Sequence, residues 1–261
     1  MDWEIMLLPY KQAVDEIKVK LENVSTQLMR AEKTSPILSV ESRLKSIPSI
    51  LAKSQRKKIL MADIEEKLDD IAGIRIICRF LEDIYRIVDI MKQREDMEII
   101  SFRNYVDNMK PSGYRSYHLV IKYPLFTAYD KRTIKCEIQI RTLAMNFWAV
   151  TEHSLRYKYH GKIPEDIQKR LIRTADACFL MDTDISAIKD EILEAEKFTL
   201  SKEEIIYDIT NSIEELYKVA KAEEVENLYK RFAQTVDSKS DDSLENFYDE
   251  VMLIAKVYNI R

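Results

Sequence analysis

An acidic pair leads directly into a run of β-branched residues in the stretch Leu68-Asp-Asp-Ile-Ala-Gly-Ile-Arg-Ile-Ile-Cys-Arg-Phe80. Because β-branched side chains pack well on a pleated surface, this run predicts a strand. A helical pattern follows at about 82–95, and three further strand patterns follow at 97–103, 118–123 and 133–141. Strands that alternate with helices predict an α+β (or α/β) fold built on a mixed sheet of four to five strands flanked by helices.

The composition is that of a globular protein with an ample core: 261 residues, of which 46% are hydrophobic and 33% are charged. The net charge of -4 argues against a non-specific DNA-binding protein, but 41 basic residues leave room for a local phosphate-binding patch. Cys78, Cys136 and Cys178 are too far apart for a zinc motif and fit a reducing compartment. Without a long apolar run or a signal-like N-terminus, the sequence predicts a cytoplasmic protein with no membrane partner.

One of only three glycines lies in the loop Lys110-Pro-Ser-Gly-Tyr-Arg-Ser-Tyr-His118. Glycine permits sharp turns and a close approach of the backbone to a ligand. An aromatic ring can stack on a base, while Lys and Arg can neutralise phosphate. The loop therefore predicts part of a nucleotide pocket, with Lys110, Tyr114 and His118 as candidate ligands.

Polar side chains alternate with apolar ones on the last predicted strand, so Glu137, Gln139 and Arg141 share one face. A solvent-exposed face is one interpretation. We favour a functional face, because half-exposed strands usually carry Thr, Lys or Ser rather than these three residues together. Asp70 and Glu137 could converge on Mg²⁺ beside phosphates. Asp69 is expected to point away, because adjacent residues of an extended segment face opposite sides.

Helical patterns fill most of the remaining chain, at about 3–30, 40–58 and 165–198, and also from Ala144 onward. The stretch 40–58 is unusually basic. Ser201-Lys-Glu-Glu204 matches a capping box and predicts the start of a new helix. We therefore divide the chain into a domain over residues 1–198 and a helical C-terminal extension over residues 199–261. The extension carries no chemical motif, and we expect it to pack, oligomerise or bind a partner.

Four of these segments resemble, in order and spacing, the synthetase domain of the RelA/SpoT family: Asp69–Arg75, Ser112–His118, Glu137–Thr142 and the helix Asn146–Lys158. Similarity is greatest to the stand-alone small alarmone synthetases of the RelQ type, and it covers residues 1–198. The resemblance implies a nucleotidyltransferase-like mixed sheet. It also implies a GTP pyrophosphokinase, which transfers pyrophosphate from ATP to the 3'-hydroxyl of GDP or GTP, giving AMP and the stringent-response alarmone ppGpp or pppGpp.

The resemblance also implies a role for each candidate residue. Asp70 and Glu137 would be catalytic and would hold Mg²⁺, and Glu137 would help to deprotonate the 3'-hydroxyl. ATP would be bound by Arg43, Ser49, Lys53, Arg56 and Arg75. GDP or GTP would be bound by Arg103, Lys110, Tyr114, His118, Gln139, Arg141, Asn146 and Glu152. Tyr114 would stack on the guanine, and Arg43 and Arg75 would sandwich the adenine. Such a transfer depends mainly on positioning and charge neutralisation.

Three further expectations follow from the resemblance. RelQ-type enzymes form homotetramers, so we expect a homo-oligomer. They also bind pppGpp through basic residues of the N-terminal helix. Lys18 matches one of these, but Glu22 and Ser25 take the next positions, and an acidic side chain disfavours a polyanion; we expect no activation by pppGpp. Family hydrolases use a His-Asp motif, and no His-Asp dipeptide occurs here, so we expect no hydrolase activity.

Two alternative functions stay open on the sequence. Some members of this fold are toxins that pyrophosphorylate tRNA or adenine nucleotides, and the extension at 199–261 could neutralise such an activity. We favour guanosine nucleotides because the match from Glu137 onward is tighter to alarmone synthetases. Alternatively, the basic helix and Tyr114 could bind single-stranded RNA without chemistry. Such a module would have no need of Asp70 and Glu137.

Overall fold

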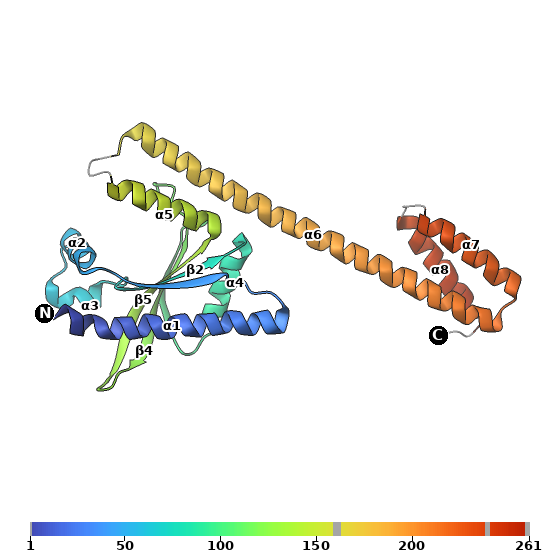
Figure 1. Cartoon of the computed structure of the whole chain (residues 1–261), viewed down its shortest axis with the longest axis horizontal. Coiled ribbons are helices and arrows are strands. Elements are labelled where there is room, and N and C mark those ends of the chain that lie inside the picture. The colour runs from blue at the N-terminus through green and yellow to red at the C-terminus, as the bar shows by residue number, and fades with distance from the viewer. Residues whose placement is uncertain (1, 159–162, 238–240, 259–261) are drawn as a thin grey trace. The chain divides into compact units, whose positions relative to one another are not determined.

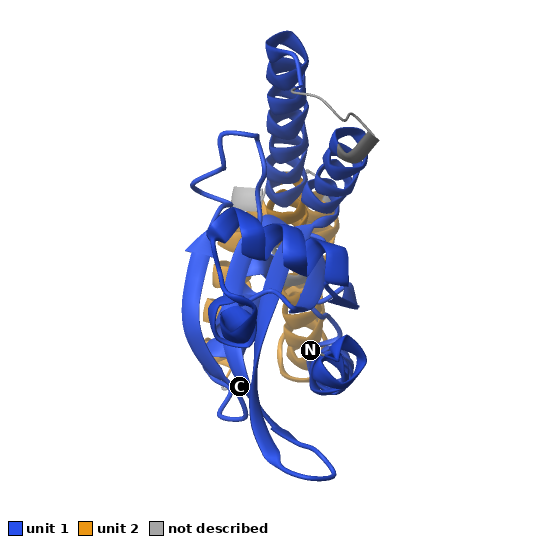
Figure 2. Ribbon diagram, turned by 90° about the vertical axis from the view of Figure 1, so that its left-hand side faces the viewer, with its two compact units in different colours: residues 1–187 blue, residues 188–261 orange. Residues whose placement is uncertain are grey.

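The computed structural model describes residues 2–158, 163–237 and 241–258. It divides the chain into two compact units, an N-terminal unit over residues 1–187 and a C-terminal unit over residues 188–261 (Figure 2). The boundary falls within one long helix, α6 (Glu165–Val219) (Figure 1). The expected helix start at Ser201–Glu204 is wrong, because α6 continues through this segment.

The N-terminal unit is built on a mixed five-stranded sheet with the strand order β1-β2-β5-β4-β3. The strands are β1 (Ser39–Leu44), β2 (Ala72–Cys78), β3 (Glu98–Asn104), β4 (Tyr117–Phe126) and β5 (Lys131–Thr142). β2 and β5 are parallel, and every other neighbouring pair is antiparallel. The predicted fold class, a mixed sheet of four to five strands flanked by helices, is confirmed.

The segment 40–46 corrects the sequence-based expectation of a helix. Most of it belongs to β1, which pairs antiparallel with β2. Ser39 lies opposite Ile77 at one end of this pairing, and Leu44 lies opposite Ala72 at the other. A helix does follow, but it begins at α2 (Ile47–Lys57), and Pro48 lies in its first turn. Proline is tolerated there, because the first backbone N–H groups of a helix have no partner within it. Pairing with β2 therefore overrides the helical pattern of this segment.

One face of the sheet is covered by helices and holds the core. The helix α1 (Trp3–Glu32) is capped by Asp2, whose side chain accepts hydrogen bonds from the backbone N–H groups of the first turn. Its buried side chains join those of α4 (Leu81–Lys92) and of the sheet in one apolar cluster. Ile17 and Ile138, both fully buried, are examples. This face therefore supplies the hydrophobic stabilisation of the unit.

Strand register gathers polar side chains on the opposite face. Along one row across the sheet, Glu41 pairs with Arg75, Arg75 with Gln139, Gln139 with His118, and His118 with Arg103. Residues paired in register project from the same face. One row thus brings together side chains from all five strands, although they are far apart in the sequence.

The C-terminal unit has an apolar core of its own. It is formed by the end of α6 with α7 (Ala222–Asp237) and α8 (Asp241–Val257). Ile213, Val225 and Val251 are almost fully buried, and Phe247 stacks on Phe232 with ring centroids 6.1 Å apart. No helix in the described ranges is both long and apolar enough to cross a membrane.

Candidate active site

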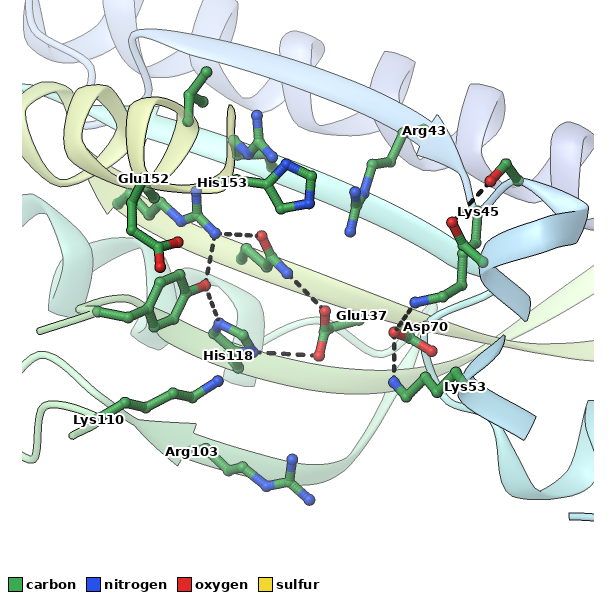
Figure 3. Close-up of a pocket in the computed structure, with 18 of the residues that line it drawn as sticks. Arg43, Lys45, Lys53, Asp70, Arg103, Lys110, His118, Glu137, Glu152 and His153 are labelled. Atoms are coloured by element: carbon green, nitrogen blue, oxygen red, sulfur yellow. Dashed lines mark hydrogen bonds and ion pairs between the residues drawn. The ribbon is translucent and has the colours of Figure 1, made fainter. Parts of the chain in front are cut away.

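A cavity of about 810 Å³ opens on the polar face of the sheet (Figure 3). All five strands contribute side chains to it, together with α2, the loop before β4, and the helix α5 (Leu143–Lys158), which carries Glu152 and His153. The lining residues are Arg43, Leu44, Lys45, Ser46, Ser49, Lys53, Asp70, Arg75, Arg103, Lys110, Tyr114, His118, Glu137, Gln139, Arg141, Ala149, Val150, Glu152 and His153.

The structure brings together all of the candidate site residues except Arg56 and Asn146. Arg56 is exposed on α2, and Asn146 is partly buried, with its Oδ1 accepting a hydrogen bond of 3.4 Å from Arg141. Lys45 and His153, for which the sequence motifs indicated no role, also line the cavity. The signal for Lys45 was its spacing of two residues from Arg43, which places both on one side of an extended chain.

Asp70 lies just before β2 and is held by two lysines. Lys45 and Lys53 donate to its Oδ2 from 2.7 and 2.5 Å. Burial raises the pKa of this carboxyl group, but the two ammonium groups outweigh burial and lower it below its usual value. Its other oxygen, Oδ1, is buried and has no hydrogen-bond partner. An ionised, buried oxygen of this kind is costly unless a ligand completes its contacts.

Glu137 on β5 is ionised, and each of its two carboxylate oxygens has one hydrogen-bond partner. Gln139 donates to its Oε2 from 2.7 Å, and His118 Nδ1 lies 3.2 Å from its Oε1. Burial raises the pKa of Glu137, but these hydrogen bonds and nearby positive charge lower it to about 2. Since each carboxylate oxygen can accept two hydrogen bonds, Glu137 keeps the capacity to accept a proton or to bind a cation.

Both carboxylates suit Mg²⁺. In the described part of the chain no group of three or more His, Cys, Asp and Glu side chains could hold a metal ion. Mg²⁺ nevertheless needs only one or two protein carboxylates, because it keeps several of its water molecules. The unpartnered Oδ1 of Asp70, in a cavity that Glu137 also lines, therefore fits this ion better than a metal that demands a full protein cage.

Positive charge dominates the cavity, although the whole chain is acidic. Seven Lys and Arg residues line it against three acidic residues, while the chain carries a net charge of -4. Lys110 Nζ lies over the rings of Tyr105 and Tyr114, 4.3 and 4.7 Å from their centroids. Burial lowers the pKa of Lys110, and the nearby Arg103 lowers it further. The cavity is thus prepared for a polyanion such as a nucleotide phosphate.

Gly113 allows the loop before β4 to pack closely on α6. Its φ of 90° lies in the left-handed region, and a Cβ atom there would be 2.8 Å from Ala175 Cβ. The turn is closed by a 2.8 Å hydrogen bond from Gly113 N to Lys110 O. This geometry presents Lys110 and Tyr114 to the cavity, as the position of the glycine in the sequence indicated.

Comparison with known proteins identifies relatives of this chain. The model described as "Region found in RelA / SpoT proteins" matches residues 42–162. GTP pyrophosphokinase YjbM of Bacillus subtilis (strain 168) is 47% identical over 194 residues, which cover 74% of this chain and 92% of that protein. The matched family region contains all of the residues that line the cavity.

Solved structures give the same result. The crystal structure of small alarmone synthetase 1 from B. subtilis bound to its product pppGpp superposes with a TM-score of 0.70 at 47% identity, covering 73% of this chain and 97% of that chain. The structure of the same enzyme bound to AMPCPP gives a TM-score of 0.65 at 43% identity, with coverage of 74% and 98%.

Proposed function

The chain belongs to the RelA/SpoT family, among the small alarmone synthetases, and from this premise we propose that it transfers pyrophosphate from ATP to the 3'-hydroxyl of GDP or GTP. The observation that carries the proposal is the cation-rich cavity with two ionised carboxylates on its floor. Its relatives include proteins named GTP pyrophosphokinase, and related crystal structures contain pppGpp and AMPCPP.

The reaction requires a proton acceptor beside the 3'-hydroxyl. We assign this role to Glu137, which is ionised at neutral pH and retains free lone pairs. The 3'-oxygen attacks the β-phosphorus of ATP, the bond between that phosphorus and the α–β bridging oxygen breaks, and AMP leaves. The hydroxyl proton passes to Glu137. Phosphates entering the cavity would raise the pKa of Glu137 and so make it a better acceptor.

Mg²⁺ is the proposed cofactor, with Asp70 and Glu137 as its protein ligands. Bound there, the ion would neutralise charge on the transferred phosphates. Lys45 and Lys53 keep Asp70 ionised and fix its orientation, so that Oδ1 stays available. The assignment of Mg²⁺ is supported by the two carboxylates and by the unpartnered Oδ1 of Asp70.

Arg43 and Arg75 are proposed to bind the adenine. They line a smaller pocket of about 180 Å³ beside the main cavity, and Glu41 holds Arg75 through a 3.1 Å ion pair. Planar guanidinium groups stack well on aromatic bases. Ser49 and Lys53 of α2 would then meet the ATP phosphates, with Arg56 contributing from the exposed side of the same helix.

The acceptor nucleotide is proposed to bind on the other side of Glu137. Tyr114 would stack on the guanine, with Asn146 and Glu152 nearby, and Arg103 and Lys110 would neutralise its phosphates. The partly exposed ring of Tyr114 and the positions of both cations in the lining support this division. Since GDP and GTP share the guanine base and the first two phosphates, we propose both as acceptors.

Four further proposals rest on the family. We propose that the protein forms a homotetramer, works in the cytoplasm and has no hydrolase activity. We also propose that residues 1–198 form the synthetase domain and that residues 199–261 form an extension to it. Activation by pppGpp is not expected. Lys18 is paired with Glu22 at 3.7 Å, and Ser25 is hydrogen-bonded to Ser35 at 2.8 Å, so the three N-terminal helix positions offer little positive charge to a polyanion.

The test is an incubation of the pure protein with Mg²⁺ and ATP labelled in its β- and γ-phosphates, with GDP, GTP and uncharged tRNA as separate acceptors. We expect label on GDP or GTP. Glu137→Gln is the matched control, because it keeps the size of the side chain but cannot accept the proton. Label on tRNA alone would instead support a toxin-like enzyme, and RNA binding without any transfer would support a binding module.

A further inference from the structure

Five side chains close a ring of hydrogen bonds on the floor of the cavity. Starting from Glu137, His118 Nδ1 lies 3.2 Å from Oε1, and His118 Nε2 lies 2.7 Å from the Tyr114 hydroxyl. Arg141 Nη2 donates to that hydroxyl from 2.6 Å and to Gln139 Oε1 from 2.7 Å. Gln139 Nε2 donates to Glu137 Oε2 from 2.7 Å, and this bond closes the ring. The dashed lines in Figure 3 trace this ring.

Donors and acceptors match at every bond of the ring. Arg141 can only donate and an ionised Glu137 can only accept, so these two residues set the direction of the others. His118 must donate from Nδ1 to Glu137, which leaves the lone pair of Nε2 for the Tyr114 hydroxyl. That hydroxyl therefore donates to His118 and accepts from Arg141. A single tautomer of a neutral imidazole satisfies the whole arrangement.

Two of the ring residues are almost buried in the wall of the cavity and are occupied by contacts with other side chains. Arg141 is only 4% exposed and His118 only 7%, and both nitrogens of the His118 ring are already engaged. Arg141 is held further by Ser116 Oγ at 3.4 Å. The sequence-based expectation gave both residues to the acceptor nucleotide. In the structure their hydrogen bonds join one side chain of the site to another.

Tyr105 braces the same assembly from one side. Its ring makes edge-to-face contacts with the rings of Tyr114 and His118. The ring centroids are 6.2 and 5.2 Å apart, respectively. Edge-to-face contacts of this kind favour one relative orientation of the rings. Tyr114 and His118 are thereby fixed as a pair, and neither ring can turn without disturbing the other.

We infer that His118 and Arg141 are positioning residues that couple the guanine-stacking ring of Tyr114 to the carboxylate of Glu137. This inference rests on the proposed function. A guanine stacked on Tyr114 holds the ring in place, the hydroxyl holds His118, and His118 orients Glu137 toward the 3'-hydroxyl. Recognition of the base and orientation of the proton acceptor therefore depend on one chain of contacts.

The critical variant is Tyr114→Phe, which keeps the stacking ring but removes the hydroxyl that joins Arg141 to His118. We expect kcat to fall about tenfold, as for the loss of one buried hydrogen bond, while the Kd for GDP, measured by calorimetry without ATP or Mg²⁺, stays within twofold. Tyr85→Phe is the matched control. Its hydroxyl bonds to Asp107 at 2.7 Å, outside the cavity lining, and its kcat should equal that of the wild type.

A double-mutant cycle tests the coupling itself. His118→Asn places an amide near the position of Nδ1, so donation to Glu137 can persist while the link to Tyr114 is lost. In that background, adding Tyr114→Phe should cost less than a further twofold in kcat, because the link is already broken. Thermal unfolding of each variant checks that the fold is intact.

Three results would overturn the inference: an unchanged kcat in Tyr114→Phe, a loss confined to GDP affinity, or effects of the two substitutions that multiply. Measuring the wild-type protein in the same assay distinguishes failure of the coupling inference from failure of the proposed function. If the wild type transfers pyrophosphate to GDP and Tyr114→Phe does so equally well, only the coupling is wrong. If the wild type transfers nothing to GDP or GTP, both are wrong.

Discussion

The N-terminal unit buries polar and charged side chains, whereas the described core of the C-terminal unit is apolar. Within the described ranges, the buried polar or charged residues all fall between positions 35 and 182, namely Ser35, Ser54, Ser116, His118, Arg141, Thr142 and Asp182. In the C-terminal unit the core consists of side chains such as Ile213, Val225 and Val251. Apolar burial stabilises a fold directly, while a buried polar group is costly unless it is paired.

This difference indicates where the chain retains groups for chemistry rather than for stability. His118 and Arg141 lie within the region matched by the family model, residues 42–162, and belong to the hydrogen-bonded ring that includes Glu137. Among the described residues of the C-terminal unit, no polar or charged residue is buried. Four substitutions test this difference between the two units.

Glu137→Gln should reduce the initial rate of pyrophosphate transfer about 1000-fold, because the amide cannot accept the 3'-hydroxyl proton. Glu250→Gln is the matched control in the C-terminal unit. Glu250 is half-exposed and pairs with Arg231 at 2.6 and 2.7 Å, and its substitution should leave the rate unchanged. Equal rates in the two variants would remove the distinction between the units.

Phe247→Ala should destabilise the C-terminal unit by about 3 kcal/mol, because a buried ring stacked on Phe232 is replaced by a cavity. Chemical denaturation followed by circular dichroism measures the effect, and the transfer rate should stay within twofold of the wild type. Leu253→Ala, on the exposed side of the same helix, is the control. A large loss of transfer in Phe247→Ala would mean that the site depends on the C-terminal core.

Asp70→Asn should lower the transfer rate about 100-fold and raise the Mg²⁺ concentration for half-maximal rate, because the amide is a poorer ligand for a hard cation. Asp69→Asn is the neighbouring control. Asp69 pairs with Lys135 at 3.1 Å instead of lining the cavity. We expect a titration with Mg²⁺ to leave Asp69→Asn close to the wild type. Similar shifts in both variants would contradict the assignment of Asp70.

Asp182→Asn should flatten the dependence of stability on pH. Burial raises the pKa of Asp182 to about 6, although Thr142 donates a 2.6 Å hydrogen bond to it. Between pH 4 and 6 the folded protein keeps a proton that the unfolded chain has released, so the free energy of unfolding falls as pH rises, by roughly 2 kcal/mol. Denaturation at several pH values measures this slope. A slope unchanged in Asp182→Asn would show that another group causes it.

Local sequence patterns were sufficient for most of the sheet. The β-branched run at 72–78 and the alternation at 136–142 lie in β2 and β5, because both signals reflect side chains that pack on a pleated surface. The segment 40–46 was misassigned because its strand depends on pairing with β2, a partner far along the chain. Lys45 received no role for the same reason.

Long-range register explains the rest of the site. Asp70, Tyr114 and Glu137 were selected from short motifs, but nothing local reveals that His118 and Arg141 face other site residues rather than solvent or ligand. That arrangement appears only when β4 pairs with β5 and places His118 opposite Gln139. Likewise, the capping pattern at Ser201 did not interrupt α6, because a capping signal is weak beside continuous helical propensity.

Hydrogen–deuterium exchange of the full chain, with and without GDP and a non-hydrolysable ATP analogue, tests directly whether the cavity of the N-terminal unit binds nucleotides. We expect slower exchange in the segments that line the cavity, at about 43–53, 110–118 and 137–153, and little change at 205–237. Slower exchange confined to 205–237, with none around Glu137, would contradict this expectation.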